Sequence, residues 1–152
     1  MKTPKRPQEL ELAIPFLLTR AGGRMGNAFA KALKPFGLGL SEWRVCASLL
    51  YVPRQTLSEL SVHATSDISA LSRIIDRLED QDLVKRERSA TDGRSIRIAL
   101  TEKGEELAQS IVPIAKRHEA VVLRDFDATD VQALRAMLLK VYENAEALDD
   151  LL

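Results

Sequence analysis

Apolar residues near the middle of the chain recur with the period of a helix. In residues 67–81 they fall at steps of three and four, which places them on one face: Leu71, Ile74, Ile75 and Leu78. The opposite face carries short hydroxyls, arginines and an acid: Ser69, Ser72, Arg73, Asp76 and Arg77. The pattern predicts a helix from Asp67 to Gln81, with one side against a core and the other side open to a partner.

Two segments with the period of a strand follow this helix. Side chains alternate in residues 83–88, and the apolar side chains of residues 95–100 share one face. Between the two segments, Asp92-Gly93 is a strong turn signal. A helix followed by a basic hairpin is typical of a winged helix-turn-helix. There the helix enters the major groove of DNA, and the hairpin, or wing, reaches the flanking backbone.

Two helices are predicted near the start of the chain. The first spans residues 15–34, because a proline at its start suits a first helical turn, and a proline and a glycine follow its end. The second spans residues 42–51 and should be capped by Ser41. Its inward face is expected to be aliphatic.

Capping residues mark the helices on either side of the hairpin. Thr56 and Glu59 fit a capping box that opens a short helix ending near Ala64. This helix and the one at residues 67–81 would form the helix-turn-helix. After the hairpin, Thr101 should cap a long helix.

The last helix carries an apolar seam. Thr129 and Gln132 fit a capping box at its start, and apolar residues then alternate at steps of three and four: Val131, Leu134, Leu138, Val141, Ala145 and Leu148. A chain of this size has too little core of its own to bury such a seam, so two copies should bury it together with the first helix. We therefore expect a twofold homodimer with a mainly α fold and a small β-hairpin wing. Residues 1–34 would be an N-terminal arm and first dimerisation helix, residues 35–100 the winged helix-turn-helix lobe, and residues 101–152 the C-terminal dimerisation helices.

Several motifs, in this order, resemble those of the MarR-type winged helix-turn-helix transcriptional regulators. They span most of the chain: Gly39-Leu-Ser-Glu-Trp-Arg-Val45, Leu83-Val-Lys-Arg86, Asp92-Gly-Arg94 and Leu100-Thr-Glu-Lys-Gly104. One position differs, because Asp82 stands where the family usually has glycine before the first wing strand. We expect Asp82 to adopt the left-handed conformation there. The resemblance implies a homodimer that binds double-stranded DNA at an inverted-repeat operator and, in many members, an aromatic acid or related anion.

The charge of the chain is balanced overall and uneven locally. The 22 basic and 22 acidic residues cancel, which argues against a nonspecific polycation. Residues 85–97 hold five bases and two acids, residues 20–34 hold four bases and no acid, and residues 143–152 hold four acids and no base. A DNA-binding face needs a local positive patch rather than a basic total, which the hairpin supplies. The sequence shows no membrane-spanning run and no signal-peptide pattern, so we expect a cytoplasmic protein.

The expected DNA contacts lie on one helix face and at the wing tip: Ser69, Ala70, Ser72, Arg73, Arg77, Asp92 and Arg94. Arg73 is the better candidate for base edges, because acids surround Arg77, which would brace the fold or touch a phosphate. In the wing, Arg94 would lie in or over a minor groove. Asp92 would hold its guanidinium by a bidentate bond. The alternatives are a solvated helix face and an ordinary surface turn.

A ligand site is expected beside the first helix. Arg20 and Arg24 lie four residues apart, close to three glycines that leave room next to the helix. They would hold an anion in the cleft between the dimer helices and the lobe, with Trp43 as an apolar wall. The expected ligand is a small aromatic carboxylate or its acyl-CoA thioester, which would release the protein from DNA. The alternatives are that both arginines are only solvated and that Trp43 belongs to the core.

The remaining reactive residues argue against an enzyme. The single cysteine, Cys46, excludes an intrachain disulfide and is flanked by apolar residues, so we expect a buried, inert thiol. The two histidines, His63 and His118, lack metal-ligand spacing, and no catalytic motif stands out, so we expect neither metal nor cofactor. We interpret the chain as a ligand-responsive repressor. The alternatives are a redox-sensing repressor that uses Cys46 and a helical scaffold that binds only proteins.

Overall fold

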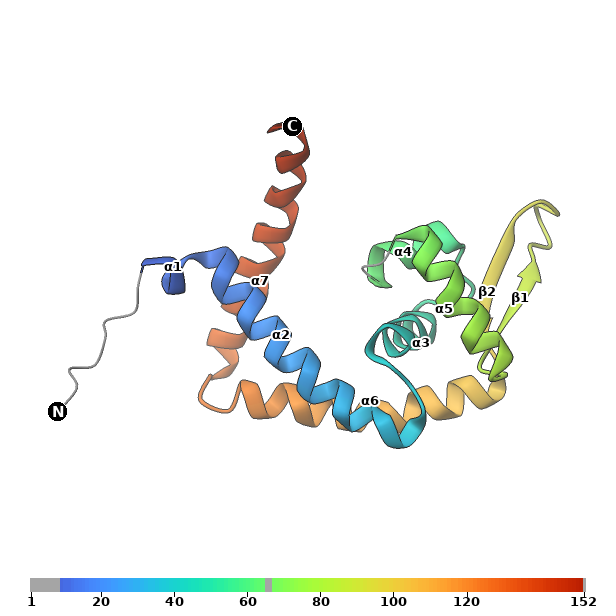
Figure 1. The fold of residues 1–152 in the computed structure, drawn as a ribbon, viewed down its shortest axis with the longest axis horizontal. Coiled ribbons are helices and arrows are strands. Elements are labelled where there is room, and N and C mark those ends of the chain that lie inside the picture. Colours follow the sequence, from blue (N-terminus) through green and yellow to red (C-terminus); the bar gives the residue numbers. More distant parts are fainter. Residues whose placement is uncertain (1–8, 65–66, 152) are drawn as a thin grey trace. The chain divides into compact units, whose positions relative to one another are not determined.

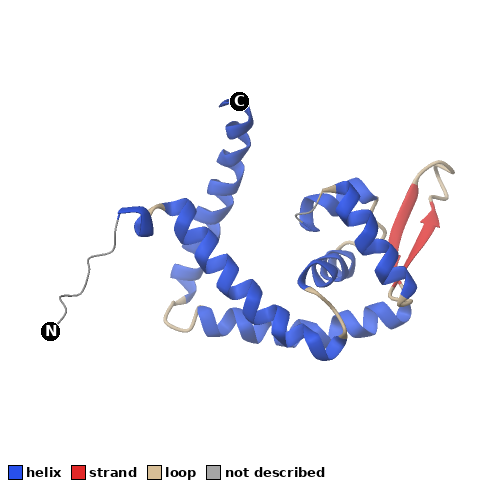
Figure 2. Ribbon diagram, in the orientation of Figure 1, coloured by secondary structure: helices blue, strands red, loops and turns tan. Residues whose placement is uncertain are grey.

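The structure is a computed structural model that describes residues 9–64 and 67–151. Figure 1 shows the elements in chain order: α1 (Glu9–Leu12), α2 (Ile14–Leu33), η1 (Lys34–Phe36), α3 (Leu40–Tyr51), α4 (Leu57–Ala64), α5 (Ile68–Asp80), β1 (Val84–Arg88), β2 (Ile96–Leu100), α6 (Glu102–Val122), α7 (Ala128–Ala145) and η2 (Glu146–Leu151). Helices dominate, and the two strands form one hairpin (Figure 2). The predicted fold class is therefore confirmed.

The chain divides into two compact units at Ala115, inside α6. The first unit holds α1 to β2 and the first part of α6, and the second holds the rest of α6, α7 and η2. The expected N-terminal arm includes residues 1–8, which lie outside the described residues. The expected division into two dimerisation regions and a DNA-binding lobe stays a prediction.

The core of the first unit is aliphatic and is built around the predicted face of α5. The residues expected to face inward from this helix are all at most 5% exposed: Leu71, Ile74, Ile75 and Leu78. They join buried side chains from α2, α3, α4, the hairpin and α6, among them Leu33, Val45, Leu49, Leu60, Val84 and Ile111. Burial of each such side chain contributes roughly 1.5–3 kcal/mol. This packing fixes which face of α5 remains exposed.

The helix starts confirm one predicted cap and correct another. At α4, the Thr56 hydroxyl accepts a hydrogen bond from the Glu59 N–H at 3.2 Å, and the Glu59 carboxylate accepts from the Thr56 N–H at 2.7 Å, as predicted. At α3, the capping residue is Gly39 and the expectation of Ser41 is wrong. Glu42 at the third helical position accepts from the Gly39 N–H, so the helix begins at Leu40 and Ser41 already lies within its first turn.

The turn between α5 and β1 uses the left-handed residue that the sequence predicts. Asp82 has a φ of 59°, and the N–H groups of Asp82 and Leu83 donate to the carbonyls of Glu79 and Leu78. These are the two bonds of a Schellman ending, which satisfies carbonyls at the end of α5. The Thr101 hydroxyl donates to the Asp82 carbonyl at 2.6 Å and accepts from the Gly104 N–H at 3.0 Å. The predicted cap of α6 thus also anchors this turn.

The hairpin has the register that the alternation predicts. Val84, Arg86 and Arg88 of β1 lie opposite Leu100, Ile98 and Ile96 of β2. Val84 and Ile98 are buried near the base, whereas Ile96 is exposed toward the tip. The hairpin is therefore rooted in the core at one end and projects at the other.

In the second unit, the cap of α7 lies two residues earlier than predicted. α7 begins after Asp127, whose carboxylate accepts from the Asp130 N–H at 2.8 Å while Asp130 accepts from the Asp127 N–H at 3.3 Å. The expected capping box of Thr129 and Gln132 is therefore wrong, because an equivalent pair two residues earlier starts the helix.

The second unit leaves apolar side chains exposed. Several large ones are 42–79% exposed, among them Met137, Leu138, Val141, Leu148 and Leu151. Across the described residues, no helix has the length and apolar content that a membrane span requires.

Candidate nucleic-acid interface

The exposed face of α5 begins at a well-formed helix start. The Asp67 carboxylate accepts from the Ala70 N–H at 2.7 Å and caps the helix. Ser69 and Arg73 are exposed, whereas Ala70 and Ser72 are half-buried at the sides of the face. The N-terminal residues of a recognition helix contact base edges. This part of α5 therefore presents a small hydroxyl and a guanidinium on a rigid surface.

Arg77 is held within the protein. Its Nε lies 3.0 Å from Oε1 of Glu42, and the Glu42 side chain is only 13% exposed. Because Glu42 also accepts from the Gly39 N–H, this ion pair ties α5 to the start of α3. The contact supports the alternative that Arg77 braces the fold.

A second ion-pair cluster joins β1 to the C-terminal half of α5. The guanidinium of Arg86 lies 2.7 Å from a carboxylate oxygen of Asp76 and 2.7 Å from one of Glu79. The hydrogen bond to Asp76, followed by the contacts with Glu79, raises the pKa of Arg86 above its ordinary value. These contacts hold the wing against the helix and neutralise acids there. The sequence pattern did not predict them, because residues ten positions apart meet only after the chain turns at Asp82.

The wing tip places Arg94 in a short, hydrogen-bonded loop. The Asp92 carboxylate accepts from the backbone N–H of Arg94 at 3.1 Å, and the Asp92 carbonyl accepts from the Ser95 N–H at 3.0 Å. The expected bidentate bond from Asp92 to the guanidinium is therefore not formed. An aspartate in a turn bonds readily to the backbone N–H two residues on, which here fixes the loop rather than the side chain. Arg94 itself is exposed.

The arginines of the lobe thus fall into two groups. Arg77 and Arg86 are in ion pairs, and so is Arg97, which lies 3.3 Å from Glu59. Within residues 9–64 and 67–151, no hydrogen bond or ion pair involves the guanidinium of Arg73, Arg88 or Arg94. An exposed guanidinium with an open hydrogen-bonding fork is suited to phosphate oxygens or guanine edges. Arg73 lies on α5, Arg88 at the end of β1 and Arg94 at the wing tip.

The pocket that Trp43 lines includes neither of the two arginines expected to hold the anion. Arg20 lies over the ring of Phe16, 5.4 Å from its centroid, and Arg24 is exposed on the same helix. Trp43 is only 8% exposed and packs edge-on against Phe29 at 5.9 Å, so it belongs to the core, which was the alternative. Trp43 also lines a pocket of about 280 Å³ formed by α3, the residue after it and α4, together with Arg44, Ala47, Ser48, Tyr51, Val52 and His63. Neither arginine of α2 is among these residues.

Cys46 is an inert part of the core. Its side chain is 1% exposed, and burial, followed by the charge of Glu42, raises the pKa of the thiol to about 12. Because the thiolate is the reactive form, a thiol that stays protonated near neutral pH is a poor sensor of oxidants. The geometry argues against the redox-sensing alternative. In the described part of the chain, no three His, Cys, Asp or Glu residues gather as a metal site would require.

We predict that Cys46 reacts with Ellman's reagent in the folded protein only as fast as the core opens. Unfolding in guanidinium should restore the rate of a free thiol. After mild peroxide treatment, wild type and a Cys46→Ser variant should show the same DNA affinity. Protection by Cys46→Ser would instead restore the redox-sensing hypothesis.

The Cys46 thiol should also affect stability only at high pH. Since the pKa of Cys46 in the folded protein lies above the ordinary value of 9.0, ionisation of this thiol should lower the free energy of unfolding only above about pH 9.

Comparisons with known proteins agree with this geometry. A family profile described as the MarR family matches residues 38–96. The HTH-type transcriptional repressor Rv2887 of Mycobacterium tuberculosis is 31% identical over 126 residues, which cover 83% of this chain and 91% of the relative. The HTH-type transcriptional repressor IacR of Pseudomonas putida is 28% identical over 133 residues, which cover 88% and 80% of the two chains.

Solved structures show the same fold. A MarR family transcriptional regulator from Silicibacter pomeroyi superposes with a TM-score of 0.84 at 26% identity, covering 93% of this chain and 95% of that one. BpsR of Bordetella bronchiseptica superposes with a TM-score of 0.76 at 21% identity, covering 85% and 98%. DNA binding by BpsR is regulated by 6-hydroxynicotinic acid.

Proposed function

Because this chain belongs to the MarR family of transcriptional regulators, which are not enzymes, we propose that it is a homodimeric repressor that binds an inverted-repeat operator and releases it when a small anionic ligand binds. The observation that carries the proposal is the pair of open guanidinium groups, Arg73 on α5 and Arg94 at the wing tip. Arg77, Arg86 and Arg97 instead pair with acids of the lobe. Ser69, Ala70 and Ser72 complete the helix face that enters the major groove.

The test is binding of the purified protein to the DNA upstream of its own gene. In fluorescence anisotropy, we expect a specific fragment to bind at least about a thousandfold more tightly than a scrambled one at matched salt. Binding to neither fragment would favour the helical scaffold that binds only proteins, and equal affinity for both would contradict an operator-specific repressor. DNase I footprinting should then show protection with twofold symmetry.

The exposed apolar residues support a dimer. On α2, Leu17, Leu18 and Met25 are 38–45% exposed, and the seam of α7 is uncovered as well. Such faces are costly in water and are buried where two copies meet. In the dimer, the two α5 helices would lie about one DNA turn apart, roughly 34–36 Å, to reach both half-sites.

We predict that sedimentation equilibrium shows a dimer at micromolar concentration. Leu138→Glu should shift the equilibrium toward monomer, because it places a charge in the seam. Lys140→Glu changes charge on the same helix away from the seam and serves as the control. A wild-type protein that remains monomeric at this concentration would contradict both the dimer and the inverted-repeat operator.

The pocket beside Trp43 supports an aromatic anion as the ligand. Its residues combine the rings of Trp43 and Tyr51 with the basic side chains of Arg44 and His63. Aromatic walls and a few polar groups are typical of small-molecule sites. The regulator of the fold neighbour BpsR, 6-hydroxynicotinic acid, is itself an aromatic acid, which agrees with this class. The expected site on α2, where Arg20 and Arg24 would hold the anion, competes with this pocket.

We predict that an aromatic acid that lowers operator affinity is bound less tightly by the protein–DNA complex, by the same factor of about 5–150. Calorimetry with benzoate-type acids and their coenzyme A thioesters would identify the compound. Tyr51→Ala should weaken its binding if the pocket on α3 is the site, whereas the double variant Arg20→Ala, Arg24→Ala should do so if α2 holds the anion. Equal ligand affinity with and without DNA would remove the allosteric part of the proposal.

A further inference from the structure

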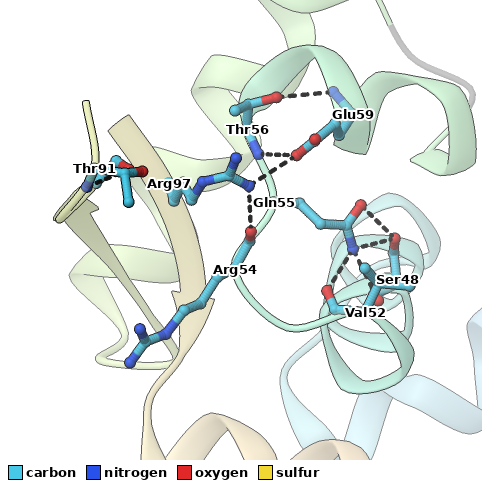
Figure 3. Close-up of polar contacts among 9 residues, drawn as sticks. Ser48, Val52, Arg54, Gln55, Thr56, Glu59, Thr91 and Arg97 are labelled. Carbon is cyan, nitrogen blue, oxygen red and sulfur yellow. Dashed lines mark hydrogen bonds and ion pairs between the residues drawn. The ribbon is translucent and has the colours of Figure 1, made fainter. Parts of the chain in front are cut away.

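Gln55 is the one polar residue that the described structure buries among the apolar core residues, at 2% exposure. It lies between α3 and α4 and makes contacts in two directions (Figure 3). Its side-chain amide nitrogen lies 2.7 Å from the Val52 carbonyl, 3.0 Å from the Ser48 carbonyl and 3.0 Å from the Ser48 hydroxyl. The Ser48 carbonyl lies in the last turn of α3 and also accepts from the Val52 N–H, whereas the Val52 carbonyl lies just past the helix, where helical N–H partners run out. The side chain of Gln55 therefore closes the end of α3.

The backbone of Gln55 pairs with the wing. Its N–H donates to the Ile98 carbonyl at 3.0 Å, and the Ile98 N–H donates to the Gln55 carbonyl at 2.7 Å. Ile98 lies in the middle of β2 opposite Arg86, and its N–H and carbonyl face the edge of β2 that β1 does not occupy. A single residue thus acts as a third strand and links α3 directly to the hairpin.

Arg54 and Arg97 reinforce the link between Gln55 and the hairpin. Arg54 adopts a φ of 61°, a conformation that residues other than glycine rarely take. Its carbonyl accepts from Arg97 of β2 at 2.9 Å, and the same guanidinium lies 3.3 Å from Glu59 of α4 (Figure 3). A strained backbone persists only where neighbouring groups hold it. Here the hydrogen bond from Arg97 of the wing holds the backbone of Arg54. We call Gln55, Arg54, Arg97 and Glu59 the wing clasp.

We propose that Gln55 is a positioning residue for DNA binding, which sets the position of the wing tip, and so of Arg94, relative to the helix-turn-helix. The proposal rests on the proposed function, since it assumes that Arg94 contacts DNA. Arg86 holds β1 to α5, and the wing clasp holds β2 to α3 and α4, so both strands of the hairpin are fixed. Ser48 and Val52 also line the pocket beside Trp43, so the same residue joins that pocket to the wing.

The first arm of the test needs no DNA. Gln55→Met keeps the size of the side chain and removes the amide that bonds the Ser48 and Val52 carbonyls. In hydrogen-exchange mass spectrometry, peptides covering β2 should exchange roughly tenfold faster than in wild type, while peptides covering α5 keep their protection. Unchanged exchange in β2 would overturn the proposal. Equally faster exchange in α5 would also overturn it, because Gln55 would then stabilise the whole lobe without a special effect on the wing.

The second arm is a double-mutant cycle with Arg94→Ala in operator binding. If Gln55 positions the wing, the loss caused by Arg94→Ala should be less than half as large, in log affinity, in the Gln55→Met background. Arg97→Gln, which alters only the exposed part of the wing clasp, should behave in the same way and replaces Gln55→Met if that variant does not fold. Arg88→Gln removes the same charge from the same hairpin outside the clasp, so its effect should add to that of Arg94→Ala.

Additive effects for Gln55→Met and Arg97→Gln would overturn the proposal. A wild-type protein that does not bind its upstream DNA would instead overturn the proposed function, and the exchange arm alone would then decide the role of Gln55.

Discussion

Replacing Gly104 by alanine should destabilise the first unit by about 3 kcal/mol, because the position has no room for a side chain. An added Cβ would overlap the Leu83 carbonyl oxygen and lie 2.8 Å from its carbonyl carbon and 3.2 Å from Cδ2 of Leu100. Two of these atoms are backbone, so no rotamer change can relieve the clash. The same Leu83 carbonyl accepts from the Thr101 N–H at 3.1 Å, so moving it would disturb the start of α6.

Thermal unfolding at one fixed protein concentration would measure this effect. For a chain of this size, about 3 kcal/mol corresponds to a fall in Tm of roughly 6–12 °C. Gly93→Ala is the matched control, because an added Cβ there meets nothing within 4 Å, and its Tm should change little. A Tm for Gly104→Ala within about 2 °C of wild type would show that α6 and the turn before β1 can move apart freely, contrary to the close approach of Gly104 and Leu83.

Signals that are local in the chain predicted most of the lobe. The burial of Leu71, Ile74, Ile75 and Leu78 follows from their spacing alone, and the capping box at α4 follows from Thr56 and Glu59. The left-handed Asp82 follows from its place between a helix and a strand. Each of these depends on residues within about four positions of one another, where backbone geometry leaves few choices.

The misplaced helix starts show where local rules become ambiguous. Both Asp127 and Thr129 could cap α7, and each has a suitable partner three residues later. The choice depends on which turn packs better, and the sequence pattern does not contain that information. The same ambiguity applies to Gly39 and Ser41 before α3, where Glu42 completes the cap of Gly39.

Contacts between distant residues could not be predicted from the sequence pattern. The ion pairs of Arg77 with Glu42 and of Arg86 with Asp76 join residues 35 and 10 positions apart. The charge pattern made Arg73, Arg77 and Arg94 candidate DNA contacts, and the pairing with Glu42 separates Arg77 from the other two. The role of Gln55 is of the same kind, since a glutamine in a loop carries no pattern that would predict burial.

We expect Arg94→Ala to weaken operator binding by about 1–3 kcal/mol, or roughly 5- to 150-fold, with little change in Tm. The side chain is exposed and the loop around it is held by Asp92 and by backbone hydrogen bonds, so its removal should leave the fold intact. Arg73→Ala should weaken binding by a similar amount and also reduce the preference among half-site variants. Competition assays with single-base-pair variants of the operator would measure that preference. Arg77→Ala is the control with equal loss of charge, and it should affect Tm more than it affects base preference, because its partner is Glu42.

The dependence of affinity on salt separates the two roles. If Arg94 meets the backbone or a narrow minor groove, its removal should weaken all sequences alike and reduce the slope of log K against log salt by about 0.9, the value for one phosphate contact on B-DNA. If Arg73 contacts a base edge, its removal should change the ranking of operators while the slope falls less. Arg73 and Arg94 variants that both bind like wild type at matched salt would show that the DNA contacts lie elsewhere. The two exposed guanidinium groups would then have to serve another anion, and the helix face of α5 would lose its assignment as the DNA-contacting surface.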